Sequence, residues 1–274
     1  MLICNYIGVF LTFRCQLGCS YCINKQGGLK PRRELSSHDW CAILKDIQTR
    51  EDLPITLQGG EPTLYKDFYH LVRALHYAGK KIDLLTNGYF DVHEFMDKTD
   101  PDMFRRQAPY ASIRFSYHQN TEPLKLLSHV HALQRRGYSV GIWGLDHPDM
   151  EKANAQVARE CRALGIDYRE KEFLDATHGT YKYPAGVSGK RVGRVKCYPS
   201  EMLYAPDGKL YPCHHFLYSG VEHHGPECRD YGRCNFCDLK MKTDRFQKGG
   251  HCSVRIEEMC QYCGEDPATC ICDE

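Results

Sequence analysis

The sequence predicts an α/β protein in which a partial barrel of strand–helix units is followed by a small cysteine-rich subdomain. Over residues 1–175, short apolar runs alternate with segments of helical periodicity, a pattern typical of parallel strands joined by helical crossovers. Over residues 197–274, apolar periodicity is weak and cysteines are frequent, so bound metal is expected to replace a large core. The segment between them, 176–196, is rich in Gly, Lys and Arg and is expected to be a linker loop.

Six strands are expected where apolar runs end near turn-forming residues: 3–13, 54–58, 81–86, 111–116, 138–144 and 166–173. Apolar residues at helical spacing predict four helices between them, around 40–47, 68–75, 126–133 and 153–164. Six strands with helical crossovers favour a partial (β/α)6 TIM barrel over a complete eight-fold one. A hairpin is expected after the linker, around the turn Pro206-Asp207-Gly208.

Charge and hydropathy exclude several classes of partner. The chain has 36 Lys+Arg against 35 Asp+Glu, so its net charge of +1 provides no field that attracts nucleic acid or a membrane surface. No uncharged apolar run approaches the roughly 18 residues of a membrane-spanning helix. The apolar start lacks a basic leader and a cleavage site. We therefore expect a soluble, cytoplasmic protein with neither a nucleic-acid nor a membrane partner.

The cysteines are numerous and unevenly distributed. There are 16 of them, and ten fall from Cys197 onward, several at C-x-x-C spacing. In a secreted protein this could be a disulfide framework. Without a leader, reduced thiols that bind metal are the favoured interpretation.

Three cysteines follow the first predicted strand at the spacing Cys15-x3-Cys19-x2-Cys22. Three thiolates can ligate only three irons of a [4Fe–4S] cubane, which leaves one iron open. An open iron can chelate the amino and carboxylate groups of S-adenosylmethionine beside a sulfonium that an electron can cleave. The alternative is a zinc site that a distant fourth ligand completes.

The segment CQLGCSYC resembles the signature of the radical S-adenosylmethionine (radical SAM) superfamily, C-x3-C-x-aromatic-C. The resemblance implies that Cys15, Cys19 and Cys22 are the catalytic ligands of a SAM-binding [4Fe–4S] cluster. It also implies that S-adenosylmethionine is cleaved to a 5′-deoxyadenosyl radical, and that Tyr21 packs near the adenine.

The same resemblance implies further cofactor contacts at Gly59, Gly60, Glu61, Asn87, Ser116, Ile142 and Phe173. The first three belong to a GGEP motif, which in the family binds the amino group of the cofactor. The next two stand where relatives contact the ribose, and the last two where they line the adenine pocket. The polar residues among them fall at the C-terminal ends of predicted strands, which form the mouth of the barrel, although each of the last four could equally be a cap or a core residue.

The spacing Cys197-x10-Gly208-x4-Cys213 is similar to the opening of twitch and SPASM subdomains. That similarity implies an auxiliary [4Fe–4S] cluster held by Cys197, Cys213, Cys234 and Cys237, with zinc as the alternative. The later cysteines do not fit the SPASM order, which leaves a second auxiliary cluster, a zinc ion or no metal open for Cys252, Cys260, Cys263, Cys270 and Cys272.

These features predict a radical SAM oxidoreductase that abstracts a hydrogen from a small molecule, with net oxidation assisted by an auxiliary cluster. The preference for a small molecule follows from the lack of an obvious domain for recognising a leader peptide. A flavodoxin- or ferredoxin-type protein is expected to donate the low-potential electron. The alternatives are a peptide maturase that crosslinks or oxidises side chains, a non-redox epimerase or mutase, and, from another class, a zinc-binding interaction module.

The remaining titratable candidates fall into two groups. Five of them, expected at the barrel mouth, are candidates for a general base: Tyr117, His118, Asp146, His147 and Glu172. Four histidines near the C-terminal cysteines are expected to be surface or loop residues: His214, His215, His223 and His224.

Overall fold

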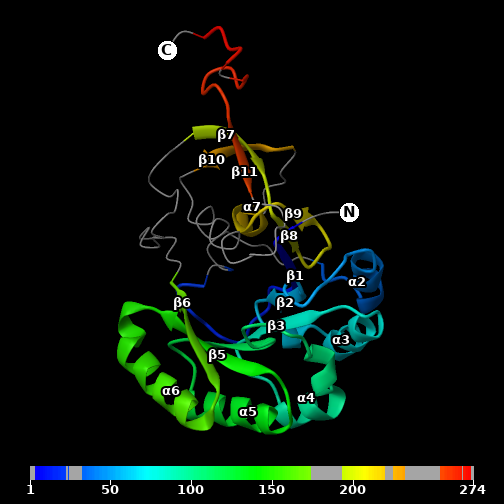
Figure 1. The fold of residues 1–274 in the computed structure, drawn as a ribbon, viewed down its shortest axis with the longest axis vertical. Coiled ribbons are helices and arrows are strands. Elements are labelled where there is room, and N and C mark those ends of the chain that lie inside the picture. The colour runs from blue at the N-terminus through cyan, green and yellow to red at the C-terminus, as the bar shows by residue number, and fades with distance from the viewer. Residues whose placement is uncertain are drawn as a thin grey trace.

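The computed structural model describes residues 4–22, 24, 33–173, 193–219, 225–231, 254–266 and 268–272 of the chain. Eight strands form one sheet in the order β6-β5-β4-β3-β2-β1-β8-β9, and three others form a second sheet in the order β10-β7-β11. In Figure 1 the large sheet and its helices occupy one end of the molecule, and the small sheet lies at the other. The α/β fold with a barrel-like parallel sheet is thus confirmed.

The strands of the large sheet are β1 (Tyr6–Thr12), β2 (Ile55–Gly59), β3 (Ile82–Thr86), β4 (Ile113–Tyr117), β5 (Val140–Asp146), β6 (Asp167–Glu172), β8 (Glu201–Tyr204) and β9 (Leu210–Tyr211). The first six correspond to the six predicted strands. Every neighbouring pair from β6 through β1 to β8 is parallel, and β9 alone runs antiparallel to its neighbour. Parallel strands place their carboxyl ends at one edge, where a barrel builds its site.

The helices are α2 (Ser37–Leu44), α3 (Phe68–Tyr77), α4 (Val92–Lys98), α5 (Pro123–Arg135), α6 (Glu151–Leu164) and α7 (His214–Ser219), with 3₁₀ turns η1 (Pro62–Leu64), η2 (Pro101–Phe104) and η3 (Pro148–Met150). Four match predicted helices, whereas α4 and α7 were not predicted. Helix α4 has only seven residues, too few for a periodic pattern, and begins at an Asp91 cap whose carboxylate accepts from His93 N and Glu94 N.

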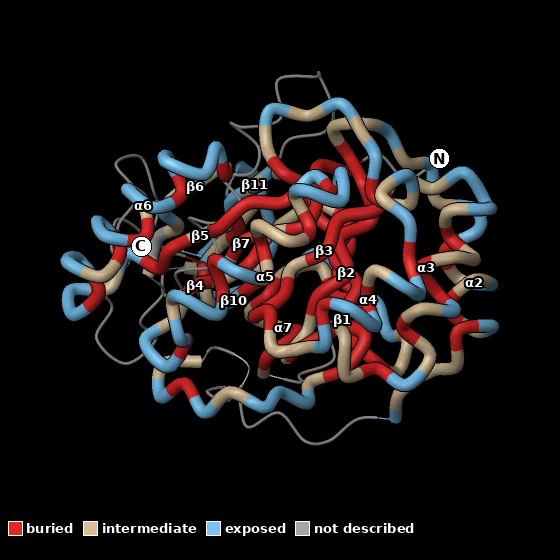
Figure 2. Tube along the Cα trace, turned by 90° about the horizontal axis from the view of Figure 1, so that it is seen from below, coloured by how far each residue is buried: buried red, intermediate tan, exposed pale blue. Residues whose placement is uncertain are grey.

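The large sheet has two chemically different faces because successive strand residues point to opposite sides. One face packs against the helices through residues such as Ile7, Ile55, Leu84 and Phe115, all at most 1% exposed. The other faces the barrel interior. Figure 2 shows buried residues running along the central strands β1, β2 and β3. The helix-facing core therefore leaves the interior face available for polar groups.

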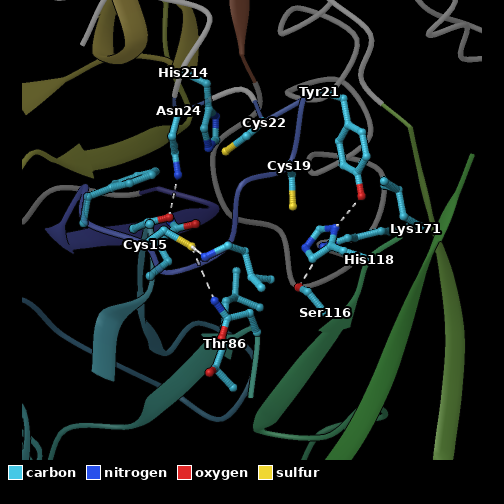
Figure 3. Close-up of a pocket in the computed structure, with 18 of the residues that line it drawn as sticks. Cys15, Cys19, Tyr21, Cys22, Asn24, Thr86, Ser116, His118, Lys171 and His214 are labelled. Atoms are coloured by element: carbon cyan, nitrogen blue, oxygen red, sulfur yellow. Dashed lines mark hydrogen bonds between the residues drawn. The ribbon is translucent and has the colours of Figure 1, made fainter. Parts of the chain in front are cut away.

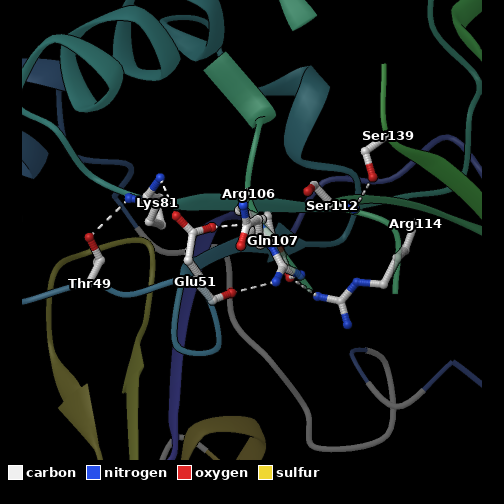
Figure 4. A network of polar contacts seen from close by, with 9 residues as sticks. Thr49, Glu51, Lys81, Arg106, Gln107, Ser112, Arg114 and Ser139 are labelled. Atoms are coloured by element: carbon white, nitrogen blue, oxygen red, sulfur yellow. Dashed lines mark hydrogen bonds and ion pairs between the residues drawn. The ribbon is translucent and has the colours of Figure 1, made fainter. Parts of the chain in front are cut away.

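Polar side chains fill the amino-terminal end of the barrel (Figure 4). The Asp83 carboxylate accepts from Arg106 Nε at 2.5 Å and Nη2 at 3.0 Å, and from Arg114 Nη2 at 2.7 Å. The side chains of Asp83 and Arg106 are fully buried. Burial raises the pKa of Asp83, and the two guanidinium groups oppose that shift. This Asp83 network joins strands β3 and β4 to the loop that follows α4, at the end of the barrel opposite the cysteine loop.

Strand β8 extends the barrel sheet with a segment distant in sequence. It pairs in parallel with β1, from Tyr6↔Glu201 to Val9↔Tyr204, and turns into β9 at Gly208, whose φ is +79°. The predicted hairpin is therefore present. The expected division at residue 197 does not coincide with the edge of the sheet, because this hairpin belongs to it.

The small sheet consists of β7 (Gly193–Tyr198), β10 (Glu227–Tyr231) and β11 (Arg255–Glu258), and both of its pairings are antiparallel. Within the part of the chain that the structure describes, its buried core consists of Val195, Cys228 and Tyr231, with partly buried neighbours beside them. The last residues of the expected linker lie in β7, and 176–192 falls outside the described residues. Across the described ranges, no helix has both the length and the apolarity needed to cross a membrane.

Candidate active site

A cavity of ≈ 400 Å³ opens at the carboxyl ends of the barrel strands, and Cys15, Cys19 and Cys22 all line it (Figure 3). The cysteines lie on the loop that follows β1. Cys15 Sγ accepts hydrogen bonds from Leu17 N and Asn87 Nδ2, both at 3.4 Å, and Cys22 N donates to Cys19 O at 3.3 Å. The described lining residues include no fourth cysteine. This donor set fits a [4Fe–4S] cluster with one open iron.

Two glycines hold the cysteine loop against the end of β2. Gly60 N donates to Thr12 O at 2.8 Å, and the next backbone N–H, that of Glu61, donates to Arg14 O at 2.8 Å. A Cβ atom on Gly59 would lie 2.1 Å from Thr12 O, and one on Gly60 would lie 2.3 Å from Arg14 O. Glycine is therefore required here for close approach of two backbone segments. Both glycines also line the cavity.

The Glu61 carboxylate joins the GGEP turn to the end of β3. Its Oε1 accepts from Thr63 Oγ1 at 2.7 Å and Thr86 Oγ1 at 2.8 Å, and its Oε2 accepts from Asn87 N at 2.7 Å. Burial raises the pKa of Glu61, and these hydrogen bonds oppose the shift. Glu61 is fully buried and is not among the lining residues. Its expected contact with the cofactor stays a prediction, and in this structure its carboxylate positions Asn87.

An aromatic group forms the wall beside β4 and β6. Tyr21 Oη lies 3.3 Å from His118 Nδ1, and the Tyr21 ring packs edge-on against Phe173 with centroids 5.6 Å apart. His147 packs against the same two rings. Burial, together with the Lys171 charge, lowers the pKa of His118 to about 3. His118 is therefore neutral at physiological pH and can act in the cavity as a hydrogen-bonding group.

Lys171 at the end of β6 is a site residue that the sequence reasoning missed. Its Nζ donates to Ser116 Oγ at 2.8 Å, and both residues line the cavity (Figure 3). Burial lowers the pKa of Lys171 to about 8, the positive charge of Arg114 adds to that effect, and Cys19 and Cys22 oppose it. The only sequence signal is alternation, because Asp167, Arg169 and Lys171 share one face of a strand rich in charge.

The segment after residue 197 completes the cavity. Glu201 at the start of β8 and His214 and Tyr218 on α7 are lining residues. His214 Nδ1 lies 3.5 Å from Glu201 Oε2, and the His214 ring packs edge-on against Phe10. The expectation that His214 is a surface or loop residue is wrong, because α7 buries it against the interior face of the sheet. The neighbouring His215 instead points to the small sheet, with Nε2 3.2 Å from Asp230 Oδ2.

The structure separates the predicted cofactor contacts into two groups. Six line the cavity: Tyr21, Gly59, Gly60, Asn87, Ser116 and Phe173. Glu61 and Ile142 do not, because both are fully buried, and the Ile142 side chain lies in the helix-facing core. Among the general-base candidates only His118 lines the cavity, whereas Tyr117 belongs to the helix-facing core. The Glu172 side chain lies outside the described residues.

The C-terminal cysteines that lie together in the structure are not the four that were expected to hold an auxiliary cluster. Cys197 lies on β7 and Cys213 directly precedes α7, whereas Cys234, Cys237 and Cys252 lie outside the described residues. The four-thiolate auxiliary site that includes Cys234 and Cys237 therefore stays a prediction. The structure brings together another set, in which the sulfur atoms all lie within 4.8 Å of one another: Cys260, Cys263, Cys270 and Cys272.

Comparison with known proteins gives sequence matches in the barrel. Residues 9–121 match the model of the radical SAM superfamily. The PqqA peptide cyclase of Ruegeria pomeroyi is 37% identical over 78 residues, which are 28% of this chain and 21% of the relative. The PqqA peptide cyclase of Rhizobium meliloti is 33% identical over the same shares of both chains. The matched region thus spans about a fifth of these curated relatives.

Solved structures resemble the fold more broadly. Streptococcus suis SuiB bound to S-adenosylmethionine matches with a TM-score of 0.57 and 14% identity, over 86% of this chain and 65% of SuiB. Native anSMEcpe with bound AdoMet and Kp18Cys peptide matches with a TM-score of 0.55 and 14% identity, over 77% of this chain and 75% of that protein. At such identity these likenesses establish the fold. The family-model match, which includes the three-cysteine loop, identifies residues 9–121 as a radical SAM superfamily domain.

Proposed function

We propose that the chain is a radical SAM enzyme that modifies a peptide. The observation that carries the proposal is the convergence of three cysteines in one cavity at the carboxyl ends of the strands, without a fourth among its described lining residues. Cys15, Cys19 and Cys22 would hold a [4Fe–4S] cluster there, which would pass an electron from an external donor to S-adenosylmethionine for its cleavage into methionine and a 5′-deoxyadenosyl radical. Three ligands suit this chemistry because a fourth would occupy the position that the cofactor needs.

The described residues around the triad have separate tasks in this proposal. Cys15, Cys19 and Cys22 hold the cluster. Gly59 and Gly60 fix the loop that carries these cysteines, since larger residues would clash with its backbone. Farther along the wall, the Lys171 ammonium offers a positive charge to a carboxylate, next to the Ser116 hydroxyl. The wall therefore combines one cationic group with polar and apolar surfaces suited to a nucleoside-bearing amino acid.

Proton transfer by His118 is not part of the proposal. A group whose pKa is about 3 is a weak base at neutral pH and carries no proton to give. Its contact with the Tyr21 hydroxyl instead fixes the aromatic residue of the cysteine loop. We assign His118 a positioning role for Tyr21.

A peptide substrate is favoured over the small molecule that the sequence suggested. The curated relatives are named PqqA peptide cyclases, and two similar structures are described with peptides, SuiA on SuiB and Kp18Cys on anSMEcpe. These names describe those proteins, and they support the same substrate class here. Net oxidation of the peptide, an auxiliary cluster as electron acceptor and a flavodoxin- or ferredoxin-type donor complete the proposal.

The test of the radical reaction is direct. Protein reconstituted with iron and sulfide, then given dithionite and S-adenosylmethionine, is expected to form 5′-deoxyadenosine. The Cys15→Ala/Cys19→Ala/Cys22→Ala variant is expected to form none. Cys41→Ala is the matched control, because Cys41 lies on α2 and does not line the cavity. Equal product from the triple variant and the native protein would refute the assignment.

The substrate class is tested separately with deuterium. Peptides encoded beside the gene, labelled at their carbon positions, are expected to transfer deuterium to 5′-deoxyadenosine and to lose hydrogen by mass spectrometry. A matched set of labelled small alcohols serves as the competing class. Transfer from an alcohol and from none of the peptides contradicts the peptide proposal while leaving the radical SAM chemistry intact.

A further inference from the structure

Four cysteines beyond β11 converge on one point at the end of the molecule farthest from the barrel helices (Figure 1). The sulfur atoms of Cys260, Cys263, Cys270 and Cys272 all lie within 4.8 Å of one another, and Cys263 Sγ is 3.5 Å from Cys270 Sγ. A disulfide would place two sulfur atoms about 2 Å apart, and all four residues are free cysteines. The arrangement is therefore a set of four separate thiol donors directed at a common centre.

We propose that these four thiolates bind a single tetrahedral zinc ion, and not an auxiliary iron–sulfur cluster. Sulfur ligands about 2.3 Å from one zinc ion lie about 3.8 Å from one another in tetrahedral geometry. In a [4Fe–4S] cubane each cysteine ligates a different iron. The distance from each cysteine sulfur to the centre of the site is therefore one iron–sulfur bond plus the distance from that iron to the cluster centre, so the four sulfur atoms lie farther apart than around a single ion. The observed upper limit of 4.8 Å fits one central ion and leaves too little room for four irons.

The backbone turns around the four cysteines direct their sulfur atoms toward one point, as in a metal site whose ligands all come from the protein. The first pair, Cys260-x-x-Cys263, ends at Gly264, whose φ is +80° and whose N–H donates to Cys260 O at 3.0 Å. In a tight turn of this kind, glycine supplies the left-handed conformation that closes the turn.

The second pair is built by a separate turn. Asp266 O accepts from Thr269 N and Cys270 N, each at 3.0 Å, and the Asp266 side chain accepts from Ala268 N at 2.8 Å. Cys272 N then donates to Cys270 Sγ at 3.3 Å. Two independent turns thus present two sulfur atoms each, which is how a closed four-ligand site is assembled from a short chain segment.

The location of the site explains why metal is needed there. Gln261 between the first two cysteines pairs with the β7 backbone, since Arg194 N donates to its Oε1 at 2.6 Å and its Nε2 donates to Arg194 O at 3.1 Å. The guanidinium of Arg194 packs on Gly264, less than 3 Å from where a Cβ atom would stand. Among the described residues, the buried core of the small sheet consists of Val195, Cys228 and Tyr231. A bound ion would fix β11 and its following turns on β7 and so add to this small described core.

Zinc is favoured over a single iron for two reasons. Thiolate sites bind Zn²⁺ more tightly than Fe²⁺, in line with the general order of divalent affinities. Cys263 and Cys272 are exposed to solvent, and zinc has no redox chemistry that exposure could disturb. A site of four thiolates and Zn²⁺ carries two negative charges, and the adjacent Arg194 guanidinium is a suitable neighbour for it.

Metal analysis tests the proposal in the full-length chain. In a Cys15→Ala/Cys19→Ala/Cys22→Ala background, anaerobically purified protein is expected to contain one more zinc per chain than the same background with Cys263→Ser and Cys270→Ser. Iron per chain, measured after reconstitution with iron and sulfide, is expected to be equal in the two proteins. Cys41→Ser in the same background is the matched control and should lose no zinc. A difference of about four irons, or no difference in zinc, overturns the proposal.

A measurement on the unsubstituted chain covers the case in which the variant fails to fold. X-ray absorption at the zinc edge is expected to show sulfur ligands at about 2.3 Å without a neighbouring metal. Replacement of the zinc by Co²⁺ should give the intense visible absorption of a tetrahedral thiolate complex. Nitrogen or oxygen ligation at the zinc edge, or a Co²⁺ spectrum of an octahedral ion, contradicts the four-thiolate site even if the radical SAM proposal holds.

Discussion

The cysteine loop after β1 and the four-cysteine turns after β11 use the same side chain for opposite purposes. The loop presents three sulfur atoms to the wall of a cavity, and the rest of that wall comes from strands that are distant in sequence. The turns gather four sulfur atoms from 13 consecutive residues, 260–272, and close them on one point. The number of ligands therefore separates a reactive site from a structural one, since only the incomplete set leaves room for a further ligand.

Addition of a fourth sulfur ligand to the three-cysteine site should have the largest effect on activity. Asn87 lines the cavity with its Nδ2 3.4 Å from Cys15 Sγ, so Asn87→Cys adds a fourth sulfur atom beside the triad. We expect this variant to keep its iron but to lose 5′-deoxyadenosine formation, because the open iron position becomes occupied. Iron analysis and product assay check the two parts. The matched variant Asn87→Ser removes the same hydrogen bond without a new sulfur, and equal activity of the two variants contradicts the prediction.

The buried Asp83 network is expected to stabilise the barrel independently of the C-terminal site. Asp83→Asn leaves the guanidinium groups of Arg106 and Arg114 buried beneath the cavity without their carboxylate. Loss of one partner from a buried ion pair typically costs about 3–5 kcal/mol of the free energy of unfolding. We expect a loss of that size in denaturant titrations, with the zinc content of the C-terminal site unchanged. Glu51→Gln is the control, because its pair with Lys81 is partly exposed; a loss no larger than the control's would contradict a role for the buried network.

The third prediction uses the titration of Lys171. Lys171→Met is expected to weaken S-adenosylmethionine binding to the reconstituted protein by about 1.5–3 kcal/mol, or roughly 10–150-fold. Because burial lowers the pKa of Lys171 to about 8, the ammonium is present below that pH and is lost above it. Native affinity should therefore fall as the pH rises through about 8, and the variant should show no such fall. Equilibrium dialysis measures both.

Lys81→Met is the control for that experiment, since Lys81 pairs with Glu51 at the opposite end of the barrel. Its affinity for S-adenosylmethionine should follow the native pH profile. A Lys171→Met profile that overlays the native one would remove the ammonium from the proposed site.

The smallest effect is expected at the docking of the C-terminal turns. Hydrogen bonds from Arg194 and Arg229 lower the pKa of Glu227 to about 2. A carboxyl group with a lowered pKa contributes stability above its unfolded-state pKa and loses that contribution as the pH falls through its folded value. Glu227→Gln should therefore speed hydrogen exchange of the β7 amides at neutral pH, with the difference from native protein vanishing near about pH 2. Because these side chains are partly exposed, the change should be small.

Glu94→Gln, which removes an exposed pair with Lys98 on α4, is the control for this last variant. It should leave β7 exchange unaltered at every pH. A Glu227→Gln difference that persists unchanged in acid would show that the carboxylate charge is not its cause.

The barrel strands could be predicted because the apolar residues within each strand indicate that it is buried. Residues such as Ile55 and Leu57 are buried against helices, so apolar runs mark the strands even without knowledge of their partners. The two unpredicted helices lacked that signal. Helix α4 is short. Helix α7 has the sequence HHFLYS, and its two histidines interrupt the apolar pattern that the buried residues Leu217 and Tyr218 would otherwise give. Burial of α7 depends on β8 lying next to β1, which no local pattern reveals.

The candidate site was predictable to the extent that its residues lie close in sequence. The spacing of the triad sufficed for the cysteine loop. Lys171 stands in the run DYREKE, which looks like an exposed strand, and its proximity to Ser116 arises only when β4, β5 and β6 align in register. Ile142 lies in the helix-facing core, since a one-residue shift along a strand moves a side chain to the other face, and its expected cofactor contact stays a prediction.

The pairing of β8 with β1 has a practical consequence for anyone who shortens the chain. A fragment that stops after β6 would leave the backbone donors and acceptors of β1 without their partners from Glu201–Tyr204. It would also expose Phe10, which Leu203 and Tyr218 now cover. An uncovered strand edge next to an aromatic surface is a template for intermolecular association, so such a fragment should precipitate and is a poor starting point for a minimal catalyst.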